Sequence, residues 1–206
     1  MKQKHFIDSH KVATAIAILA LMYWTGNWDN TTAWVYFGLH GAYGILWMFK
    51  SQMFGDKQWD QPTSFWYGIV IWLALTGYWS APYFILTTDF EAPPWFLGLA
   101  IFCNVIGVFF HFTADMQKHT QLRFNPGNLI TDGVWSRTRN PNYFGELLIY
   151  VGFASLAWHW FPLVWLAAMI LVVWLPNMIK KDKSLSRYGE FAEYKKRSAF
   201  FIPFMF

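Results

Sequence analysis

One short segment near residue 140 combines an amide, an acid and basic residues at helical spacing. Asn142 and Glu146 are four residues apart and therefore share one face of a helix, which Pro141 is well placed to begin. Glu146 would lie one turn inside an apolar helix, where an acid is costly and marks a functional site or a partnered group. Two interpretations are open: Glu146 serves binding or chemistry, or it pairs with Arg137 or Arg139 to fix the loop.

A basic tail after the last apolar stretch is the second candidate region. Its lysines and arginines, between residues 180 and 197, are interrupted by Tyr188, Phe191 and Tyr194. This spacing suits a short helix packed against the membrane domain. Basic residues beside a membrane often anchor lipid headgroups. Together with the segment before Pro141, they could instead enclose an anionic ligand that carries several phosphates.

His40 and Tyr43 are the polar pair of the N-terminal half. They are three residues apart inside an apolar stretch, so they face one side of a helix. Polar groups in a membrane helix need partners, and the pair either bonds between helices or contacts a substrate. Gly38, Gly41 and Gly44 recur at every third position of the same stretch and predict close helix packing.

The composition is that of a membrane protein. Hydrophobic residues make up 55% of the 206 residues and charged residues 14%, against roughly 25% charged in soluble domains. Membrane topology explains the net charge of +4, and we expect no nucleic acid partner. The six histidines are scattered without zinc spacing and Cys103 is the single cysteine, so the sequence predicts no metal site and no intrachain disulfide.

Six apolar stretches predict an all-α, polytopic membrane fold with about six transmembrane helices. They lie near residues 11–26, 33–49, 64–86, 94–112, 143–158 and 161–179. Flanking Trp, Tyr and Lys can extend the shorter stretches toward the roughly 20 residues that span a bilayer. The longest insert between them, residues 113–142, has the length of a functional loop.

The basic residues predict the orientation. With a cytoplasmic N-terminus, all 16 lysines and arginines fall on the cytoplasmic side and the opposite loops hold none. The cytoplasmic pieces are 1–11, 50–63, 113–142 and 180–206. Because positive residues favour the cytoplasmic side, both termini are expected there. The loop and the tail then lie on the same face, where together they could enclose such an anionic ligand.

Several segments of the last hundred residues carry recognisable motifs. They are Asp115-Met116-Gln117-Lys118, Leu129-Ile130-Thr131-Asp132-Gly133, Arg139-Asn140-Pro141-Asn142-Tyr143-Phe144-Gly145-Glu146, and Glu193-Tyr194-Lys195-Lys196-Arg197 followed by Ile202-Pro203-Phe204. They resemble the C-terminal domain of the steroid 5-alpha-reductase family, and more closely its bacterial and plant branch of membrane proteins. The resemblance covers about 110–206 and includes His40-Gly41-Ala42-Tyr43-Gly44 and Lys50 before it.

The resemblance implies a membrane enzyme that binds NADPH from the cytoplasmic side and reduces a carbon–carbon double bond conjugated to a carbonyl. The substrate would be a lipophilic small molecule, steroid- or isoprenoid-like, reached among membrane lipids. The chain would form one integral membrane domain over 1–206, with 1–109 as the substrate half and 110–206 as the cofactor half. A bacterial inner membrane is the expected location, and the oligomeric state is left open.

The resemblance also assigns roles to residues. The cofactor would be held by ten residues of the insert, the fifth apolar stretch and the tail. These are Asp115, Lys118, Arg123, Arg139, Asn142, Tyr143, Glu146, Arg187, Tyr188 and Arg197. In the reductases a Glu and a Tyr of the N-terminal half meet the carbonyl. The first four apolar stretches here contain no acid, so His40 and Tyr43 are proposed as the catalytic substitutes.

Two other functions are weighed against the reductase. The same region is similar to isoprenylcysteine carboxyl methyltransferases, which share an Arg-x-Pro-x-Tyr helix opening and a Tyr-Lys-Lys-Arg tail and use S-adenosylmethionine. Their acidic pair after the last helix suits that cationic cofactor. This chain has Lys180-Lys181-Asp182-Lys183 there, which fits a polyphosphate better. A lipid-binding membrane protein without enzymatic activity is the third interpretation.

Overall fold

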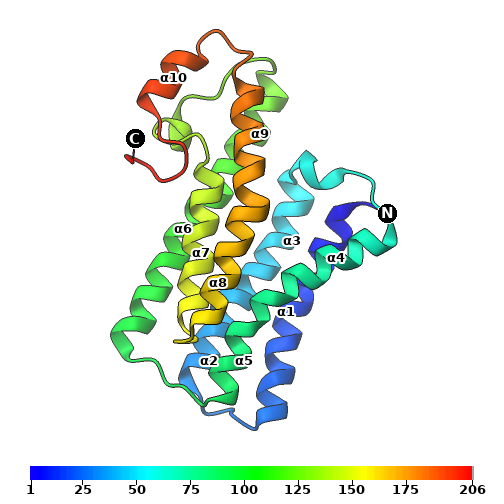
Figure 1. Cartoon of the computed structure of the whole chain (residues 1–206), viewed down its shortest axis with the longest axis vertical. Helices are drawn as coiled ribbons and strands as arrows, with labels where there is room; N and C mark the ends of the chain where they lie inside the picture. Colours follow the sequence, from blue (N-terminus) through cyan, green and yellow to red (C-terminus); the bar gives the residue numbers. More distant parts are fainter. Residues whose placement is uncertain (206) are drawn as a thin grey trace. The chain divides into compact units, whose positions relative to one another are not determined.

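The chain folds into helices throughout, and the computed structural model describes residues 1–205 (Figure 1). The α-helices are α1 (Gln3–Thr25), α2 (Thr31–Tyr36), α3 (Ala42–Phe54), α4 (Phe65–Thr76), α5 (Ser80–Thr87), α6 (Pro94–Phe124), α7 (Pro141–Ser155), α8 (Trp160–Met169), α9 (Leu175–Leu185) and α10 (Phe191–Arg197). The π-helical turns are η1 (Phe37–Gly41) and η5 (Ile170–Trp174), and the 3-10 turns are η2 (Lys57–Asp60), η3 (Gly77–Trp79) and η4 (Gly133–Trp135). The prediction of an all-α fold is confirmed.

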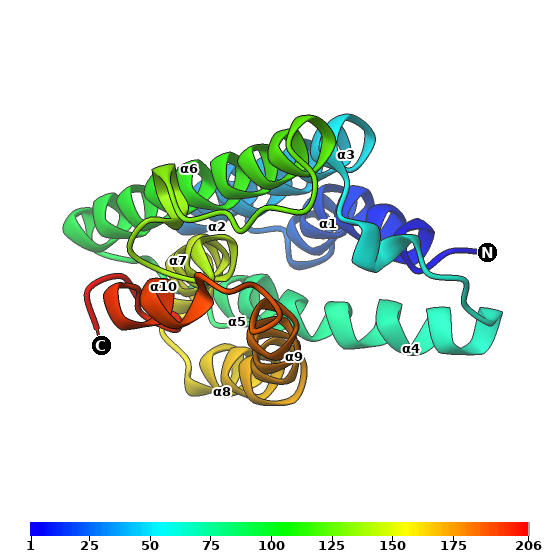
Figure 2. The ribbon, with the colours of Figure 1, turned by 90° about the horizontal axis from the view of Figure 1, so that it is seen from above.

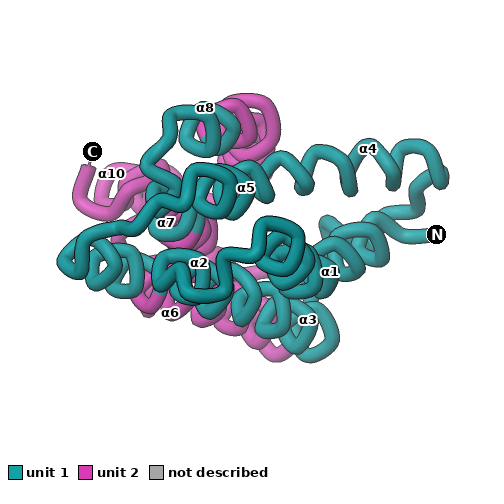
Figure 3. The backbone as a smooth tube through the Cα atoms, turned by 90° about the horizontal axis from the view of Figure 1, so that it is seen from below, with its two compact units in different colours: residues 1–104, 150–166 teal, residues 105–149, 167–206 magenta. Residues whose placement is uncertain are grey.

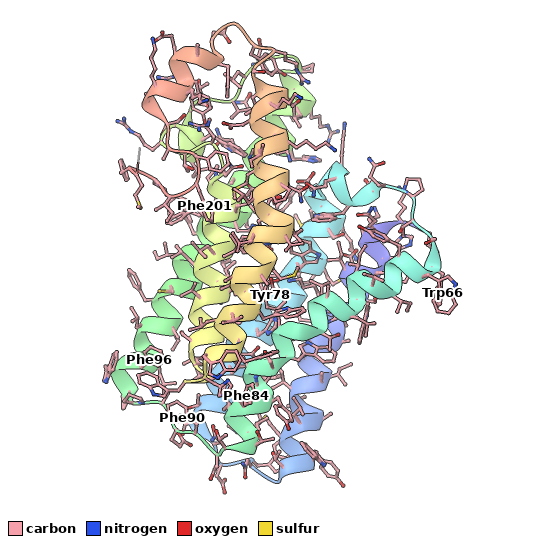
Figure 4. The ribbon with its side chains drawn as sticks, viewed as in Figure 1. Trp66, Tyr78, Phe84, Phe90, Phe96 and Phe201 are labelled. Carbon is pink, nitrogen blue, oxygen red and sulfur yellow. The ribbon has the colours of Figure 1, made fainter. Side chains whose placement is uncertain are left out.

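Four helical stretches are long and apolar enough to cross a membrane. They are Gln3–Thr25, Phe65–Thr87, Pro94–Phe124 and Trp160–Leu185. Large apolar side chains lie exposed along them, such as Trp66 on α4 (Figure 4) and Val172 on η5. Exposed apolar surface of this extent is typical of contact with lipid. The chain is therefore a multi-pass integral membrane protein.

The two other predicted spans are also helical, but they are not among these four. α2, η1 and α3 follow one another without a break, and α7 has 15 residues. A helix of that length reaches about 22 Å, less than the roughly 30 Å of the hydrocarbon core. Helices are confirmed for all six apolar stretches, whereas a count of six spans stays a prediction.

Helix α1 begins earlier than predicted, at Gln3 rather than near residue 11. No Gly or Pro interrupts the chain before Gly26, which ends the helix with a φ of 73°, in the left-handed conformation that glycine adopts readily. Asp8 and Lys11 therefore lie inside the helix, although the prediction placed Asp8 before it and Lys11 at its first residue. The first helix thus contains an acid, which the first four predicted spans lacked.

Helix α6 also extends further than predicted. Its 31 residues end at Phe124, so the interpretation of 113–142 as a loop is wrong for residues 113–124. No Gly or Pro interrupts the chain between Gly107 and Pro126, and nothing in the sequence stops the helix where the apolar stretch ends. At 1.5 Å per residue α6 is about 46 Å long, longer than the hydrocarbon core is thick.

The chain divides into two compact units (Figure 3). Unit 1 holds residues 1–104 and 150–166, and unit 2 holds residues 105–149 and 167–206. Helices α6, α7 and α8 each contribute residues to both units. The interpretation of 1–206 as a single domain with a substrate half and a cofactor half stays a prediction.

In unit 1, α1 contacts α3, α4 and α5, and Figure 2 shows α1, α3 and α4 from above. The tightest approach is at Gly44, where an added Cβ atom would lie 2.2 Å from the carbonyl oxygen of Lys11. A Cβ on Gly41 would lie 3.4 Å from the Cβ of Ala15, whereas one on Gly38 would meet nothing within 4 Å. The predicted close packing is confirmed at Gly44 and is wrong at Gly38, while a Cβ on Gly41 would make an ordinary van der Waals contact.

We expect Gly44→Ala to lower the free energy of unfolding by about 1–3 kcal/mol, because the new methyl group would force α1 and α3 apart. Gly38→Ala is the matched control on the same stretch, and it should leave stability unchanged or raise it slightly, since alanine favours helix. Thermal unfolding of both variants in detergent measures the difference. Equal melting temperatures for the two variants would contradict the close contact.

Candidate functional site

In unit 2, helices α6 and α7 touch through their backbones. A Cβ atom on Gly145 would lie 2.4 Å from the backbone nitrogen of His111 and 2.6 Å from the carbonyl oxygen of Gly107. A Cβ on Gly107 would likewise lie 2.6 Å from the carbonyl oxygen of Gly145. Glycine at both positions permits this approach, which brings polar residues of α6 beside the first turns of α7.

His111 joins the predicted cofactor residues of the two helices. Its Nδ1 lies 3.0 Å from the carbonyl oxygen of Asn142, and its Nε2 lies 3.9 Å from Oδ2 of Asp115. Both His111 and Asp115 are buried. Sequence reasoning missed His111, and the signal that could have found it is its spacing of four residues from Asp115.

The side-chain oxygen of Asn142 is a buried acceptor that has no hydrogen-bond partner within residues 1–205. Glu146 follows one turn later on α7 and is half-buried. The ring of Tyr143 lies 5.8 Å from that of Trp174, and the ammonium of Lys181 lies 6.0 Å from the Tyr143 ring. The structure therefore brings Asn142 on α7 beside His111 and Asp115 on α6. Asn142 and Glu146 both lie on α7, one turn apart, as their spacing predicted.

Arg139 is buried and holds three segments of unit 2 together. Its Nε donates to both carboxylate oxygens of Asp182 on α9, at 3.0 and 3.1 Å. Its Nη1 donates to the carbonyl oxygen of Ser198, directly after α10. The alternative that Arg139 pairs with Glu146 is wrong, because its carboxylate partner is Asp182. Sequence reasoning missed this role, since the partners are 43 and 59 residues away.

The tail after α10 is attached to the segment before α7 by further bonds. Backbone bonds of 2.9 Å join Arg139 to Ala199 and Ala199 to Arg137. The side-chain amide of Asn140 donates to the carbonyl oxygen of Phe200 at 2.6 Å. The next residue of the tail, Phe201, is labelled in Figure 4. The hydroxyl of Tyr194 donates to the carbonyl oxygen of Trp135 at 2.6 Å, and burial raises the pKa of this phenol. The predicted short helix in the tail is confirmed as α10.

The other basic candidates stand at the surface of unit 2. Arg123 ends α6, Arg187 follows α9 and Arg197 ends α10, and all three are exposed. Arg187 bonds to the hydroxyls of Ser184 and Tyr188, each at 3.1 Å. In Figure 1 the C-terminal end of α9 and helix α10 lie together at the top of the view. The structure thus leaves these three arginines exposed, at or just after the ends of α6, α9 and α10.

In unit 1, the predicted catalytic pair is buried in an aromatic core. Nδ1 of His40 lies 2.7 Å from the hydroxyl of Tyr36, and the His40 ring stacks on Phe153 with 4.1 Å between centroids. Tyr43 is also fully buried. His40 lies in the π-helical turn η1, three positions before Tyr43. Their shared interior side is as predicted.

Sequence reasoning missed two residues beside this pair, Lys11 and Tyr150. The ammonium of Lys11 donates to the hydroxyl of Tyr150 at 2.6 Å, and it lies 4.4 Å from the centroid of the Tyr43 ring. Lys11 was missed because the sequence placed the start of the first membrane helix at this residue. Its charge was therefore counted only among those that orient the chain in the membrane. Tyr150 was hidden because tyrosines are common in this aromatic-rich sequence.

The family described as "Protein of unknown function (DUF1295)" matches residues 77–198, more than half of the chain. The chain belongs to this family. A "Delta(14)-sterol reductase" of Methylotuvimicrobium alcaliphilum is 26% identical over 151 residues, which cover 64% of this chain and 35% of the relative. The chain thus spans about a third of that relative's length.

These two matches confirm the predicted resemblance to steroid reductase-like membrane proteins. The DUF1295 match contains all ten predicted cofactor residues, from Asp115 to Arg197. It does not reach His40 or Tyr43, whose catalytic assignment stays a prediction. Tyr150 lies inside the matched range and Lys11 lies outside it.

Two ion pairs of unit 2 test whether the bonds of Arg139 to Asp182 and Ser198 hold the tail in place. Arg139 and Asp182 have side chains that are 5% and 16% exposed, whereas Lys196 and Glu193 pair at 2.6 Å with side chains that are 72% and 75% exposed. We expect Asp182→Asn to cost about 1.5–3 kcal/mol of stability, because it leaves a buried guanidinium without its charged partner. Glu193→Gln, the matched control, should cost less than about 1 kcal/mol despite the shorter distance.

Thermal unfolding in detergent measures both variants, and limited proteolysis of the last residues reports whether the tail is released. Faster cleavage of the tail is expected in Asp182→Asn alone. If Glu193→Gln lowers stability or speeds cleavage of the tail more than Asp182→Asn does, the bonds of Arg139 do not hold the tail.

Proposed function

We propose that this DUF1295 protein is a membrane reductase that acts on a lipophilic substrate. In the finer form of the proposal, NADPH binds to unit 2 and the enzyme reduces a carbon–carbon double bond conjugated to a carbonyl. The name of the relative, a sterol reductase, supports the reaction class. We further propose that both termini are cytoplasmic, in a bacterial inner membrane, and that residues 1–109 receive the substrate.

The observation that carries the proposal is a set of exposed arginines in unit 2 without acidic partners. Within residues 1–205, no carboxylate lies in ion-pair distance of Arg123, Arg137, Arg187 or Arg197, whereas Arg139 is paired with Asp182. A planar guanidinium can bind two phosphate oxygens at once, so these side chains are suited to a diphosphate and a 2′-phosphate. We propose that Arg123, Arg187 and Arg197 bind the phosphates of NADPH.

The buried end of the site fits the uncharged part of the same cofactor. The unpartnered oxygen of Asn142 is an acceptor for an amide N–H, which the nicotinamide carboxamide carries. Asp115 and Glu146 would accept hydrogen bonds from cofactor hydroxyls, and Lys118, Tyr143 and Tyr188 would line the site. When bound, NADPH would supply a hydride to the substrate.

A methyltransferase function is less favoured, because the carboxylate of Asp182 is already bound by Arg139. This acid interrupts the basic run Lys180–Lys183, and its carboxylate is bound by Arg139. At the start of the tail, the positive sulfonium of S-adenosylmethionine would therefore meet lysines and a carboxylate that is already bound. Repulsion of this kind opposes binding of a cation and favours a polyanion.

We expect Arg123→Ala, Arg187→Ala or Arg197→Ala to weaken NADPH binding. Loss of one charge-assisted bond to phosphate costs about 1.5–3 kcal/mol, roughly 10- to 150-fold in affinity. At least one variant should weaken NADPH more than NADH, because NADH lacks the 2′-phosphate. Lys57→Ala removes an exposed positive charge in unit 1 and is the matched control, expected to leave binding unchanged. Titration in detergent at two salt concentrations measures these constants.

Salt should weaken NADPH binding in the unmodified protein, because exposed charges are screened. S-adenosylmethionine carries no phosphate and would show neither the salt effect nor a preference between nucleotides. Binding of S-adenosylmethionine that survives all three arginine substitutions, with no binding of NADPH, would show that the chain is not an NADPH reductase.

Asn142→Ala tests the buried end of the site separately. The variant should weaken NADPH by about 2- to 13-fold, the value of one neutral hydrogen bond. It should cost little stability, because the oxygen removed has no hydrogen-bond partner among residues 1–205. Asn177→Ala, at a half-buried position of α9, is the control. An unchanged NADPH constant in a stable Asn142→Ala protein would remove Asn142 from the cofactor site.

A further inference from the structure

Unit 1 contains a positive charge in its apolar interior. Lys11 is 3% exposed and lies eight residues after the start of α1, about 12 Å along the helix. A charge at such a position within a candidate membrane span is costly and marks functional sites by default. Lys11 therefore calls for an explanation beyond the orientation of the chain.

Aromatic side chains surround this ammonium group. It lies over the rings of Tyr43, Trp47 and Tyr150, with 4.4, 5.0 and 5.1 Å to the respective centroids. Ring faces of this kind stabilise a cation through their negative quadrupole. The contacts also keep the long side chain in one direction, so that its hydrogen bond to Tyr150 is fixed.

Tyr150 is held as firmly as Lys11. It is buried, its ring lies 4.2 Å from that of Tyr78 and 5.0 Å from that of Phe153, and Figure 4 labels Tyr78, in the turn η3 between α4 and α5. Its oxygen accepts the hydrogen bond from Lys11 at 2.6 Å, so the phenol hydrogen is directed elsewhere. A positive ammonium group beside this oxygen stabilises the phenolate that remains after the phenol gives up its proton.

We infer that Tyr150 is the proton donor of the reaction and that Lys11 is the residue that positions and activates it. The inference rests on the proposed reductase. In that reaction bound NADPH would supply a hydride to the β carbon. The π pair of the carbon–carbon double bond then moves between the α carbon and the carbonyl carbon, and the π pair of the carbonyl moves to its oxygen. Tyr150 donates a hydrogen bond to this oxygen and then transfers its proton. The product of this transfer is an enol, which becomes the saturated carbonyl compound when the α carbon takes up a proton from solvent and the oxygen releases its proton. The phenolate of Tyr150 is stabilised by Lys11 and regains a proton from solvent.

This arrangement replaces the predicted pair of His40 and Tyr43. The ring nitrogen Nδ1 of His40 is bonded to the hydroxyl of Tyr36, and its ring is stacked on Phe153. Tyr43 offers its ring face to Lys11. Both residues therefore shape the environment of the Lys11–Tyr150 pair, while the charge-assisted bond that favours proton transfer belongs to Tyr150.

The test uses testosterone, which has one conjugated carbonyl, and the intact protein in detergent. Infrared difference spectra measure the carbonyl stretch of the bound steroid, with and without NADP⁺, so no turnover is needed. A hydrogen bond from Tyr150 lowers this frequency in the unmodified protein. Tyr150→Phe should abolish the shift, and Lys11→Met should reduce it. Tyr83→Phe and Lys57→Met, at exposed positions of unit 1, are the matched controls and should retain it.

Steady-state rates provide the second measurement. Tyr150→Phe should lower kcat by about 10²- to 10⁴-fold, the usual contribution of a general acid, with a much smaller change in KM. Lys11→Met should also lower kcat more than KM, and Lys11→Arg should restore part of it because the positive charge returns. The NADPH dissociation constant should be the same in all of these variants.

The results separate this inference from the proposed function. If NADPH does not bind but the testosterone carbonyl shift depends on Tyr150, the reductase proposal fails and the carbonyl contact stands. If NADPH binds and the shift is absent, or persists in Tyr150→Phe, the inference is wrong and the reductase proposal stands. Loss of the shift in Tyr43→Phe with retention in Tyr150→Phe would assign the proton to Tyr43. Should Tyr150→Phe fail to fold, the kcat of Lys11→Met and its recovery in Lys11→Arg decide.

Discussion

The backbone contact between α6 and α7 determines where the polar groups of unit 2 lie. Gly107 and Gly145 have no side chain, and the two helices approach until backbone atoms touch. At this separation His111 reaches the carbonyl oxygen of Asn142, and Asp115 stands one turn away on α6. A larger residue at either glycine would separate Asp115 from Asn142, which are 27 residues apart in the sequence. The candidate cofactor site would then lose its buried end.

The arginines of unit 2 divide according to burial. Arg139 is enclosed and needs its bonds to Asp182 and Ser198, because an uncompensated buried charge is strongly destabilising. The exposed Arg123 and Arg197 have no such requirement, since water already solvates them. One residue type thus serves two purposes. The buried Arg139 orders the tail, and the exposed Arg123 and Arg197 remain available for a ligand.

Much of the fold could be predicted from the sequence, since apolar stretches without interruption predict helices, and Pro141 and Pro94 begin helices as expected. The ends of helices were harder to predict. Polar residues do not stop a helix as Gly and Pro do, so α1 and α6 run past their apolar parts. That error hid Lys11. The pairing of Arg139 with Asp182 could not be predicted for another reason. A single sequence does not indicate which distant segments contact each other.

The π-helical turn η5 sets the rotation of everything that follows it on α9. A π turn accommodates one residue more than an α turn, and each residue of an α-helix advances the side chain direction by about 100°. The face of α9 that carries Asp182 is therefore aligned with Arg139 through one extra residue within Ile170–Trp174. In evolutionary terms, a single-codon deletion in this apolar stretch would preserve the composition of the span. It would nevertheless turn the carboxylate away from the guanidinium and detach the tail that both hold.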